Sequence, residues 1–251
     1  MAGHSHAANI RHRKAAVDAK RGKLWSKLSK AIIVAAKMGG GDPDMNPRLR
    51  QAVADAKAVS MPKDNIERAI KKGTGELEGG DVEELIYEGF GPAGVAVMCD
   101  IMTDNRNRTA PEIRKVFEVC GGNLGATNSV AWMFERKGQF VFSAEEVDEE
   151  TLTMAALEAG AEDVRREGDV FQVLCDPSVY TSVREGLEKA NLQPLSSGLT
   201  RIPTTTVTVE DPEDARRVLK LMEMLDDHDD VQNVSANYRI PDEVLAAISN
   251  E

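Results

Sequence analysis

The order of secondary-structure signals between residues 135 and 203 constrains the fold of this chain more than any other feature. A strand pattern at 138–143 precedes a helix that Asp148 is expected to cap, and a hairpin pattern follows at 162–175. Asp176-Pro177 then has the form of an N-cap followed by Pro at the first helical position, and an extended segment completes the unit. The order β-α-β-β-α-β predicts a ferredoxin-like unit.

Further strand and helix patterns flank this unit on both sides. The expected strands are 82–90, 94–104, 204–209 and 230–240. Between the first two and the unit lies a helix, for which Thr109 and Glu112 have the spacing of a capping box. Asp211-Pro212 opens another helix between the last two strands. The segments before and after the unit can pair with one another, so we expect the ferredoxin-like unit to be an insertion.

The segment before residue 75 contains only helical signals. We expect one helical region from about Arg11 to Met38, ended by three consecutive glycines. A second helix begins at Pro47 with Asn46 as its N-cap, and a third begins at Pro62. The expected fold is therefore α+β, with a helical domain, a discontinuous α+β domain and an inserted ferredoxin-like α+β domain. These three domains are expected at 1–75, at 82–134 with 204–251, and at 135–203.

The charge of the chain is divided between its parts. The formal net charge is −11, yet residues 1–75 hold 16 Lys and Arg against 6 Asp and Glu, a balance of +10. The remaining residues therefore carry −21. Because basic segments attract phosphate and acidic bodies repel it, this division favours a nucleic-acid-binding N-terminal domain over an ordinary solvated face.

Several other classes of function find little support in the sequence. Cys99, Cys120 and Cys175 are odd in number and lack zinc-site spacing, which is typical of free thiols in a reducing compartment. The apolar run at 31–36 is too short to cross a membrane, and we expect no signal peptide. Common nucleophile and metalloprotease motifs do not occur. Because such motifs are missing, we expect no catalytic residue and no cofactor. The N-terminal histidines lack a neighbouring Cys or carboxylate, so we also expect no metal site.

Basic side chains are concentrated in the first helical region. On a helix, Arg13, Lys20, Lys23 and Lys27 fall near one another, and such a stripe can follow a phosphate backbone. A solvated helix or a membrane-surface helix would show a similar stripe, but bulky apolar anchors are few before Leu24. We therefore expect no membrane partner. Lys71 and Lys72, at the end of the third helix, are further candidate phosphate contacts.

Two other charged clusters are open to more than one interpretation. Arg106 and Arg108 precede the helix expected at Thr109, where guanidinium groups and free backbone N–H groups can together bind an anion. The same arginines can instead pair with Asp100 or Asp104 and order the loop. A third cluster places His228 among four aspartates, and we expect a solvated turn there rather than a cation site, because EF-hand spacing is missing.

Five segments of the chain resemble the signatures of the YebC/PmpR family. They are "AGHSHAANIRHRKAAVDAKRGK", "AAKMGGGDPDMNPRLR", "MPKDNIERAIKKGTGE", "YEGFGPAGVAVMCD" and "TDNRNRTAPEIRK". The resemblance extends from Ala2 to the end of the chain, and the mitochondrial translational activator of cytochrome c oxidase subunit one is a relative of the family. It implies three domains, a helical one and two of α+β type, with one inserted in the other.

The resemblance also implies a function. The family is described as probable transcriptional regulators that bind DNA, and some members are regarded as translation factors that relieve ribosome stalling at proline-rich stretches. The opening motif of the family matches at Gly3, His4 and Ser5. His6 and Ala7 depart from it, since many members have Lys-Trp there, which removes a fixed positive charge and an aromatic ring that could stack.

Together, these observations predict a non-enzymatic nucleic-acid-binding regulator of gene expression. Its expected partners are DNA, ribosomal RNA or both, with the ribosome as a candidate, and it is expected to be a cytoplasmic monomer. No helix-turn-helix reader is evident, which favours RNA or shape-based binding. The alternatives are a protein-interaction scaffold and a small-molecule-handling enzyme built on the ferredoxin-like unit. The candidate nucleic-acid-binding residues are His4, Arg11, Arg13, Lys14, Lys20, Arg21, Lys23, Lys27, Lys71, Lys72, Arg106 and Arg108.

Overall fold

The structure is a computed structural model that describes residues 21–249 of the 251-residue chain. The described part begins with three helices, α2 (Arg21–Gly39), α3 (Pro47–Ala58) and α4 (Lys63–Gly73). Asn46 caps α3 as predicted, because its side-chain oxygen accepts the N–H of Leu49 at 3.1 Å. The second and third predicted helices are therefore confirmed, whereas the expected helix start near Arg11 lies outside the described residues.

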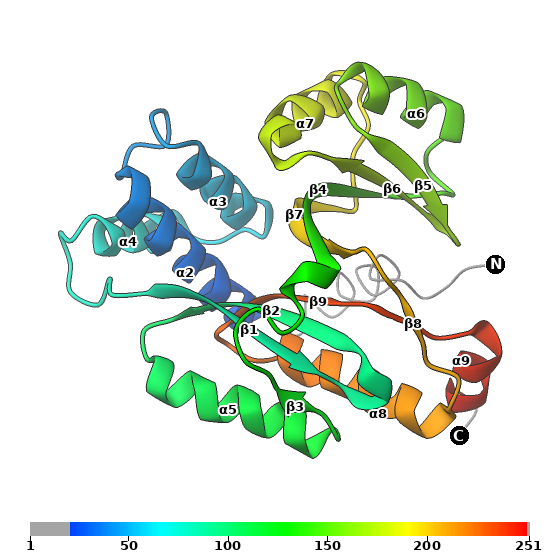
Figure 1. The fold of residues 1–251 in the computed structure, drawn as a ribbon. Helices are drawn as coiled ribbons and strands as arrows, with labels where there is room; N and C mark the ends of the chain where they lie inside the picture. Colours follow the sequence, from blue (N-terminus) through cyan, green and yellow to red (C-terminus); the bar gives the residue numbers. More distant parts are fainter. Residues whose placement is uncertain (1–20, 250–251) are drawn as a thin grey trace.

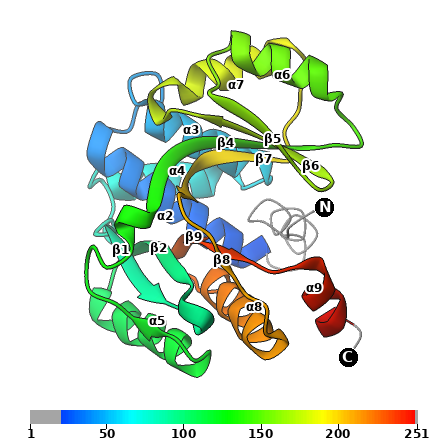
Figure 2. The same ribbon diagram turned by 45° about the vertical axis from the view of Figure 1, so that its right-hand side comes forward.

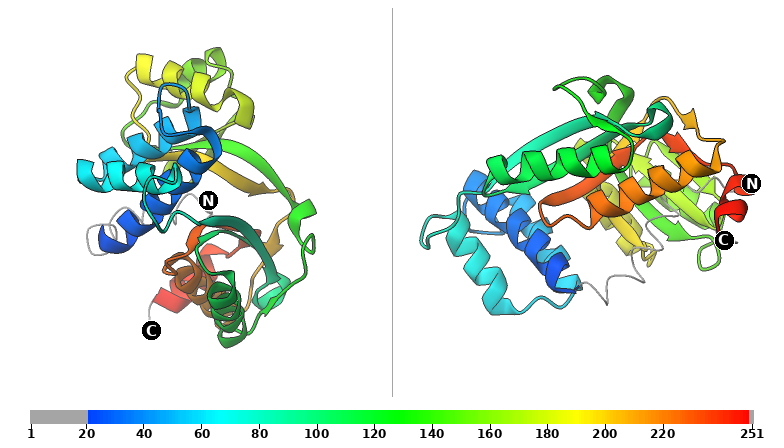
Figure 3. Two further views of the ribbon diagram at one scale, coloured as in Figure 1. Left: turned by 90° about the vertical axis from the view of Figure 1, so that its left-hand side faces the viewer. Right: turned by 90° about the horizontal axis from the view of Figure 1, so that it is seen from below.

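A four-stranded antiparallel sheet follows the helices (Figure 1). Its strands, in spatial order, are β3 (Asn123–Leu124), β1 (Glu83–Phe90), β2 (Ala96–Thr103) and β9 (Val231–Ala236). Two helices, α5 (Arg106–Val119) and α8 (Pro212–Asp226), lie side by side on one face of this sheet (Figure 3).

The central strand β2 is buried on both faces of the sheet. Val97, Cys99 and Ile101 pack among the apolar side chains of α5 and α8, as the alternation of a strand requires. Met102 points to the opposite face and belongs to the core of the three N-terminal helices. Strand β2 therefore connects the core of the helical domain to the sheet β3-β1-β2-β9, which we call the middle sheet.

The inserted unit has the predicted order of elements. Its strands β4 (Phe134–Ser143), β5 (Asp163–Glu167), β6 (Val170–Cys175) and β7 (Ser196–Pro203) form an antiparallel sheet in the order β5-β6-β4-β7. The helices α6 (Glu149–Glu158) and α7 (Tyr180–Lys189) share one core with this sheet. The ferredoxin-like arrangement is thus confirmed, and β4 and β7 run together from it toward the middle sheet (Figure 2).

The remaining elements are short. They are the 3₁₀ turns η2 (Pro92–Gly94), η3 (Ala131–Met133) and η4 (Pro177–Val179), the parallel pair β8 (Val207–Thr208) and β10 (Tyr238–Arg239), and the helix α9 (Asp242–Ser249). The strand expected at 204–209 is therefore only two residues long. The strand expected at 230–240 divides into β9 and β10, and α9 was not predicted. No helix within residues 21–249 is long and apolar enough to span a bilayer.

The predicted capping box at Thr109 is wrong. The helix α5 begins at Arg106, because Asn105 acts as the N-cap and its side chain accepts the N–H of Arg108 at 3.1 Å. Thr109 is fully buried inside the helix, where its hydroxyl lies within hydrogen-bond distance of the Asp230 carboxylate and of the Asn105 backbone carbonyl. It does not accept a backbone N–H, as the hydroxyl of a capping box does. The domain limits given above stay a prediction.

Candidate nucleic-acid interface

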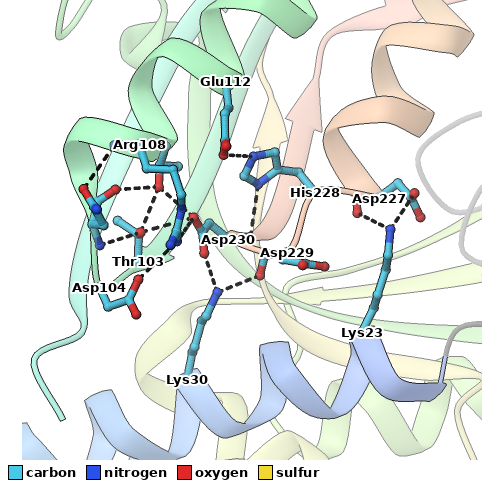
Figure 4. Close-up of polar contacts among 12 residues, drawn as sticks. Lys23, Lys30, Thr103, Asp104, Arg108, Glu112, Asp227, His228, Asp229 and Asp230 are labelled. Carbon is cyan, nitrogen blue, oxygen red and sulfur yellow. Dashed lines mark hydrogen bonds and ion pairs between the residues drawn. The ribbon is translucent and has the colours of Figure 1, made fainter. Parts of the chain in front are cut away.

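Three lysines of α2 contact an acidic segment of the same chain. Lys23, Lys27 and Lys30 are spaced four and three residues apart, so they share one face, which we call the basic face of α2. This face meets residues 226–230, the acidic segment, where α8 ends and the loop to β9 begins (Figure 4). The Lys23 ammonium lies 2.9 Å from a carboxylate oxygen of Asp227. Lys27 and Lys30 donate to backbone carbonyls of the same segment.

The end of a helix explains why this segment attracts cations. The last carbonyl groups of a helix have no partner within it and carry the negative end of the helix dipole. The carbonyls of Asp226 and Asp227, at the end of α8, accept hydrogen bonds from Lys27 and Lys23. The basic face of α2 therefore caps α8 from outside, through both charge and hydrogen bonding.

Asp230 is the buried centre of this contact. Its side chain is only 3% exposed, and its carboxylate pairs with Lys30 and with Arg108, the latter at 2.9 Å. The hydroxyls of Thr109 and Thr103 complete its surroundings at 2.6 and 3.2 Å. Burial alone would raise the pKa of Asp230, but the hydrogen bonds from Lys30, Thr109 and Arg108 hold the pKa well below its ordinary value. The carboxylate is therefore charged and joins three separate elements of the fold.

The two arginines that were open to two interpretations lie in the first turn of α5. Arg108 pairs with Asp230 and, at 3.1 Å, with Asp104, whereas Arg106 is 3.9 Å from Glu83. The structure supports the second interpretation of Arg108, because it pairs with Asp104 of its own loop and also with Asp230 of the same chain. The binding of an external anion by these arginines stays a prediction.

The expectation of a solvated turn around His228 is wrong for His228 and Asp230, although Asp229 is exposed. The His228 ring lies 3.1 Å from the Glu112 carboxylate through Nε2, and its Nδ1 accepts the N–H of Asp230 (Figure 4). Asp230 is buried, and the loop is docked on α2 and α5. The reason is long-range, because the residues that desolvate this turn lie more than 100 positions away in sequence. No local pattern distinguishes Asp230 from its acidic neighbours.

A cleft of about 760 Å³ opens beside this contact, between α2, α5 and the acidic segment. Both cations and carboxylates line its wall, and they include Lys23, Lys30, Arg108, Lys115, Asp104, Glu112, Asp227 and Asp229. Such mixed charge suits contacts within the chain as well as contacts with a charged ligand. Within residues 21–249, His, Cys, Asp and Glu side chains form no cluster that could hold a metal ion.

The structure brings some of the predicted site residues together and leaves others apart. Lys23, Lys27 and Arg108 meet at the acidic segment. Lys71 and Lys72 lie in the last turn of α4 and do not line the cleft. The helix α2 begins at Arg21, whose side chain is not described. His4, Arg11, Arg13, Lys14 and Lys20 lie outside the described residues. The nucleic-acid-binding role of all these residues stays a prediction.

The helical domain, the interrupted sheet and the ferredoxin-like insertion define a three-domain α+β protein. Family models described as "TACO1/YebC protein N-terminal domain" and "TACO1/YebC second and third domain" match residues 5–76 and 82–238. The chain therefore belongs to the TACO1/YebC family, as the resemblance in its sequence indicated.

Similar proteins span the same length. A probable transcriptional regulatory protein of Rhodopirellula baltica is 58% identical over 98% of this chain and 100% of its own length. Another from Halothermothrix orenii is 54% identical over 100% of both chains. The crystal structure of a conserved hypothetical protein from Aquifex aeolicus is 52% identical, with a TM-score of 0.87 over 94% of this chain and 98% of that one. The names of the first two relatives support a regulatory role in the family.

Proposed function

We propose that this protein is a nucleic-acid-binding regulator of gene expression that acts without catalysing a reaction. The observation that carries the proposal is the division of charge, +10 within residues 1–75 against −21 in the rest. Basic side chains that neutralise phosphates release bound counterions, and this release drives binding to nucleic acid. The regulatory names of the relatives support the same conclusion.

In this proposal the domains divide the work. The N-terminal domain docks on the phosphates of DNA or ribosomal RNA, and the acidic α+β domains face a protein or RNA partner. Contacts to phosphate position a protein without reading sequence, so target choice depends on nucleic-acid shape or on the partner. The proposed setting is the cytoplasm, where the protein acts as a monomer and the ribosome is a candidate partner.

The proposal is tested by removing the N-terminal charges. The variant Arg13→Ala/Lys14→Ala/Lys20→Ala/Arg21→Ala/Lys23→Ala is expected to bind single-stranded RNA and duplex DNA more weakly. The slope of log K against log salt should become shallower by about 0.7 to 0.9 for each phosphate that the variant no longer neutralises. Fluorescence anisotropy across a salt series measures both quantities.

A matched control removes five exposed basic residues outside the N-terminal domain. They are Arg165, Arg166, Lys189, Arg217 and Lys220. If the N-terminal variant keeps the affinity and the salt slope of the wild type, the N-terminal domain is not the binding surface. A protein-interaction scaffold would show that result.

The target itself is found by crosslinking in living cells and sequencing the attached nucleic acid. Reads from one ribosomal RNA site identify a translation factor, whose effects on transcription are then indirect. Promoter DNA without ribosomal RNA identifies a transcription regulator.

A further inference from the structure

The basic face of α2 is already in contact with the acidic segment of the same chain. Lys23, Lys27 and Lys30 bind two carboxylate and three carbonyl oxygens of the acidic segment, residues 226–230. An ammonium group makes the same kind of contact with the oxygens of a phosphate. The acidic segment therefore uses the donor groups that a phosphate backbone would need on this face.

The acidic segment is held by one strong contact and by weaker ones around it. The Asp230 carboxylate is buried and also pairs with Arg108, so it anchors the segment. By contrast, the side chains of Lys23 and Asp227 are 46% and 37% exposed. Exposed ion pairs contribute little to stability and exchange readily with water or with other ions. The outer part of the segment is therefore displaceable, while its base stays fixed.

The carboxylates of the acidic segment also act at a distance. Asp226, Asp227 and Asp229 add three negative charges beside the basic face. A phosphate group approaching Lys23 or Lys27 comes within the screening length of these charges, which is about 8 Å at physiological salt. The segment thus opposes phosphate binding both by occupying the lysines and by repulsion.

We propose that the end of α8, with Asp226, Asp227 and Asp229, is an internal competitor that covers the basic face of α2 until a nucleic-acid strand displaces it. This inference rests on the proposed function and names the regulation of that same site. The buried contact of Asp230 with Lys30 and Arg108 keeps the domains joined during the exchange. The acidic segment then lowers the affinity for nucleic acid and rejects weakly bound targets.

The test neutralises the competitor without changing its shape. The variant Asp226→Asn/Asp227→Asn/Asp229→Asn keeps the backbone carbonyls and leaves Asp230 intact. Its matched control, Glu145→Gln/Glu146→Gln/Glu158→Gln, removes the same charge from exposed positions of the inserted domain. With a 20-nucleotide single-stranded RNA as the probe, the first variant is expected to bind about three- to tenfold more tightly than the wild type, the range that a few exposed ion pairs allow. The control should stay within about twofold of the wild type.

Amide hydrogen exchange gives a second, independent readout. The N–H groups of Asp227 and His228 are bonded within the last turn of α8. Displacement by RNA should speed their exchange in the wild type, whereas binding elsewhere should leave it unchanged or slow it.

The two proposals fail in different ways. The internal competitor is refuted if the wild type binds RNA but the triple Asp→Asn variant and the triple Glu→Gln control bind it with equal affinities. It is also refuted if RNA does not speed the amide exchange of Asp227 and His228. In either case the proposed function stands. If no form of the protein binds RNA or duplex DNA, both are refuted.

Discussion

The substitution Asp230→Asn tests the central contact of the structure. It keeps the size of the side chain but removes the charge that pairs with Lys30 and Arg108. Breaking a buried ion pair costs about 3–5 kcal/mol when the remaining charge has no other partner. Here Lys30 and Arg108 are 16% and 45% exposed, so both can recover some hydration. Asn also keeps one accepting oxygen for Thr109, so we expect a loss of about 2–3 kcal/mol in the free energy of unfolding.

Urea unfolding of the full chain at pH 7 measures this loss. The control is Asp229→Asn, because Asp229 is exposed and adjacent, and its substitution should change the free energy of unfolding by less than about 0.5 kcal/mol. If Asp230→Asn is no less stable than the control, the buried carboxylate does not hold the domains together.

The pH dependence of the free energy of unfolding provides a second test of the same contact. The pKa of Asp230 is lower in the folded protein than the value of about 3.9 for an unfolded chain. Its contribution to stability is therefore fully present above about pH 5 and is lost as the pH falls toward the folded pKa. The difference between wild type and Asp230→Asn should shrink from pH 5 to pH 3. A difference that stays constant over this range would refute the reasoning.

Three further predictions concern positions away from the acidic segment. The buried Glu88 carboxylate accepts three backbone N–H groups, two from the loop before η3 and one from the first residue of η3, at 2.7–2.9 Å. The substitution Glu88→Gln should therefore lower the free energy of unfolding in urea by about 1–3 kcal/mol, and an unchanged midpoint would show that other contacts hold the loop. A Cβ on Gly73 would lie 2.4 Å from a backbone carbonyl oxygen of α2, so Gly73→Ala should destabilise the protein by about 1–3 kcal/mol. The control is Gly22→Ala, whose Cβ meets nothing within 4 Å and should not destabilise the protein. Equal melting temperatures of the two variants would contradict this reasoning. Burial raises the pKa of Cys175 to about 11, so iodoacetamide at pH 8 should label it only after unfolding, and rapid labelling of the native protein would show that the thiol is reachable.

The helix starts were the most predictable part of the fold. Asn46, Asp148 and Asp211 were each predicted as an N-cap, and each accepts the backbone N–H three residues later. Such a cap depends only on its own next few residues, so the sequence is sufficient. The same local rule failed at Thr109, because Asn105 offered a competing cap and the Thr109 hydroxyl found Asp230 instead.

The partners of the charged residues were the least predictable part of the site. The sequence indicates the basic stripe, but for its acidic partner on the loop before β9 it predicts a solvated turn. Lys30 and Asp230 are 200 positions apart, and no periodicity or spacing connects residues at that separation. Arg108 was open to two interpretations for the same reason.

The sequence by itself determined the local features of this protein: the helix starts, the β-α-β-β-α-β order and the division of charge, each of which depends on neighbouring residues or on composition. Only the tertiary structure decided which aspartate is buried, which cations it binds and that the basic face of α2 is covered from within the chain. Burial and ion pairing are properties of groups that meet in space. These properties are fixed when α2 packs against the end of α8. The two helices are far apart in the sequence, so no local stretch of the chain contains both of them.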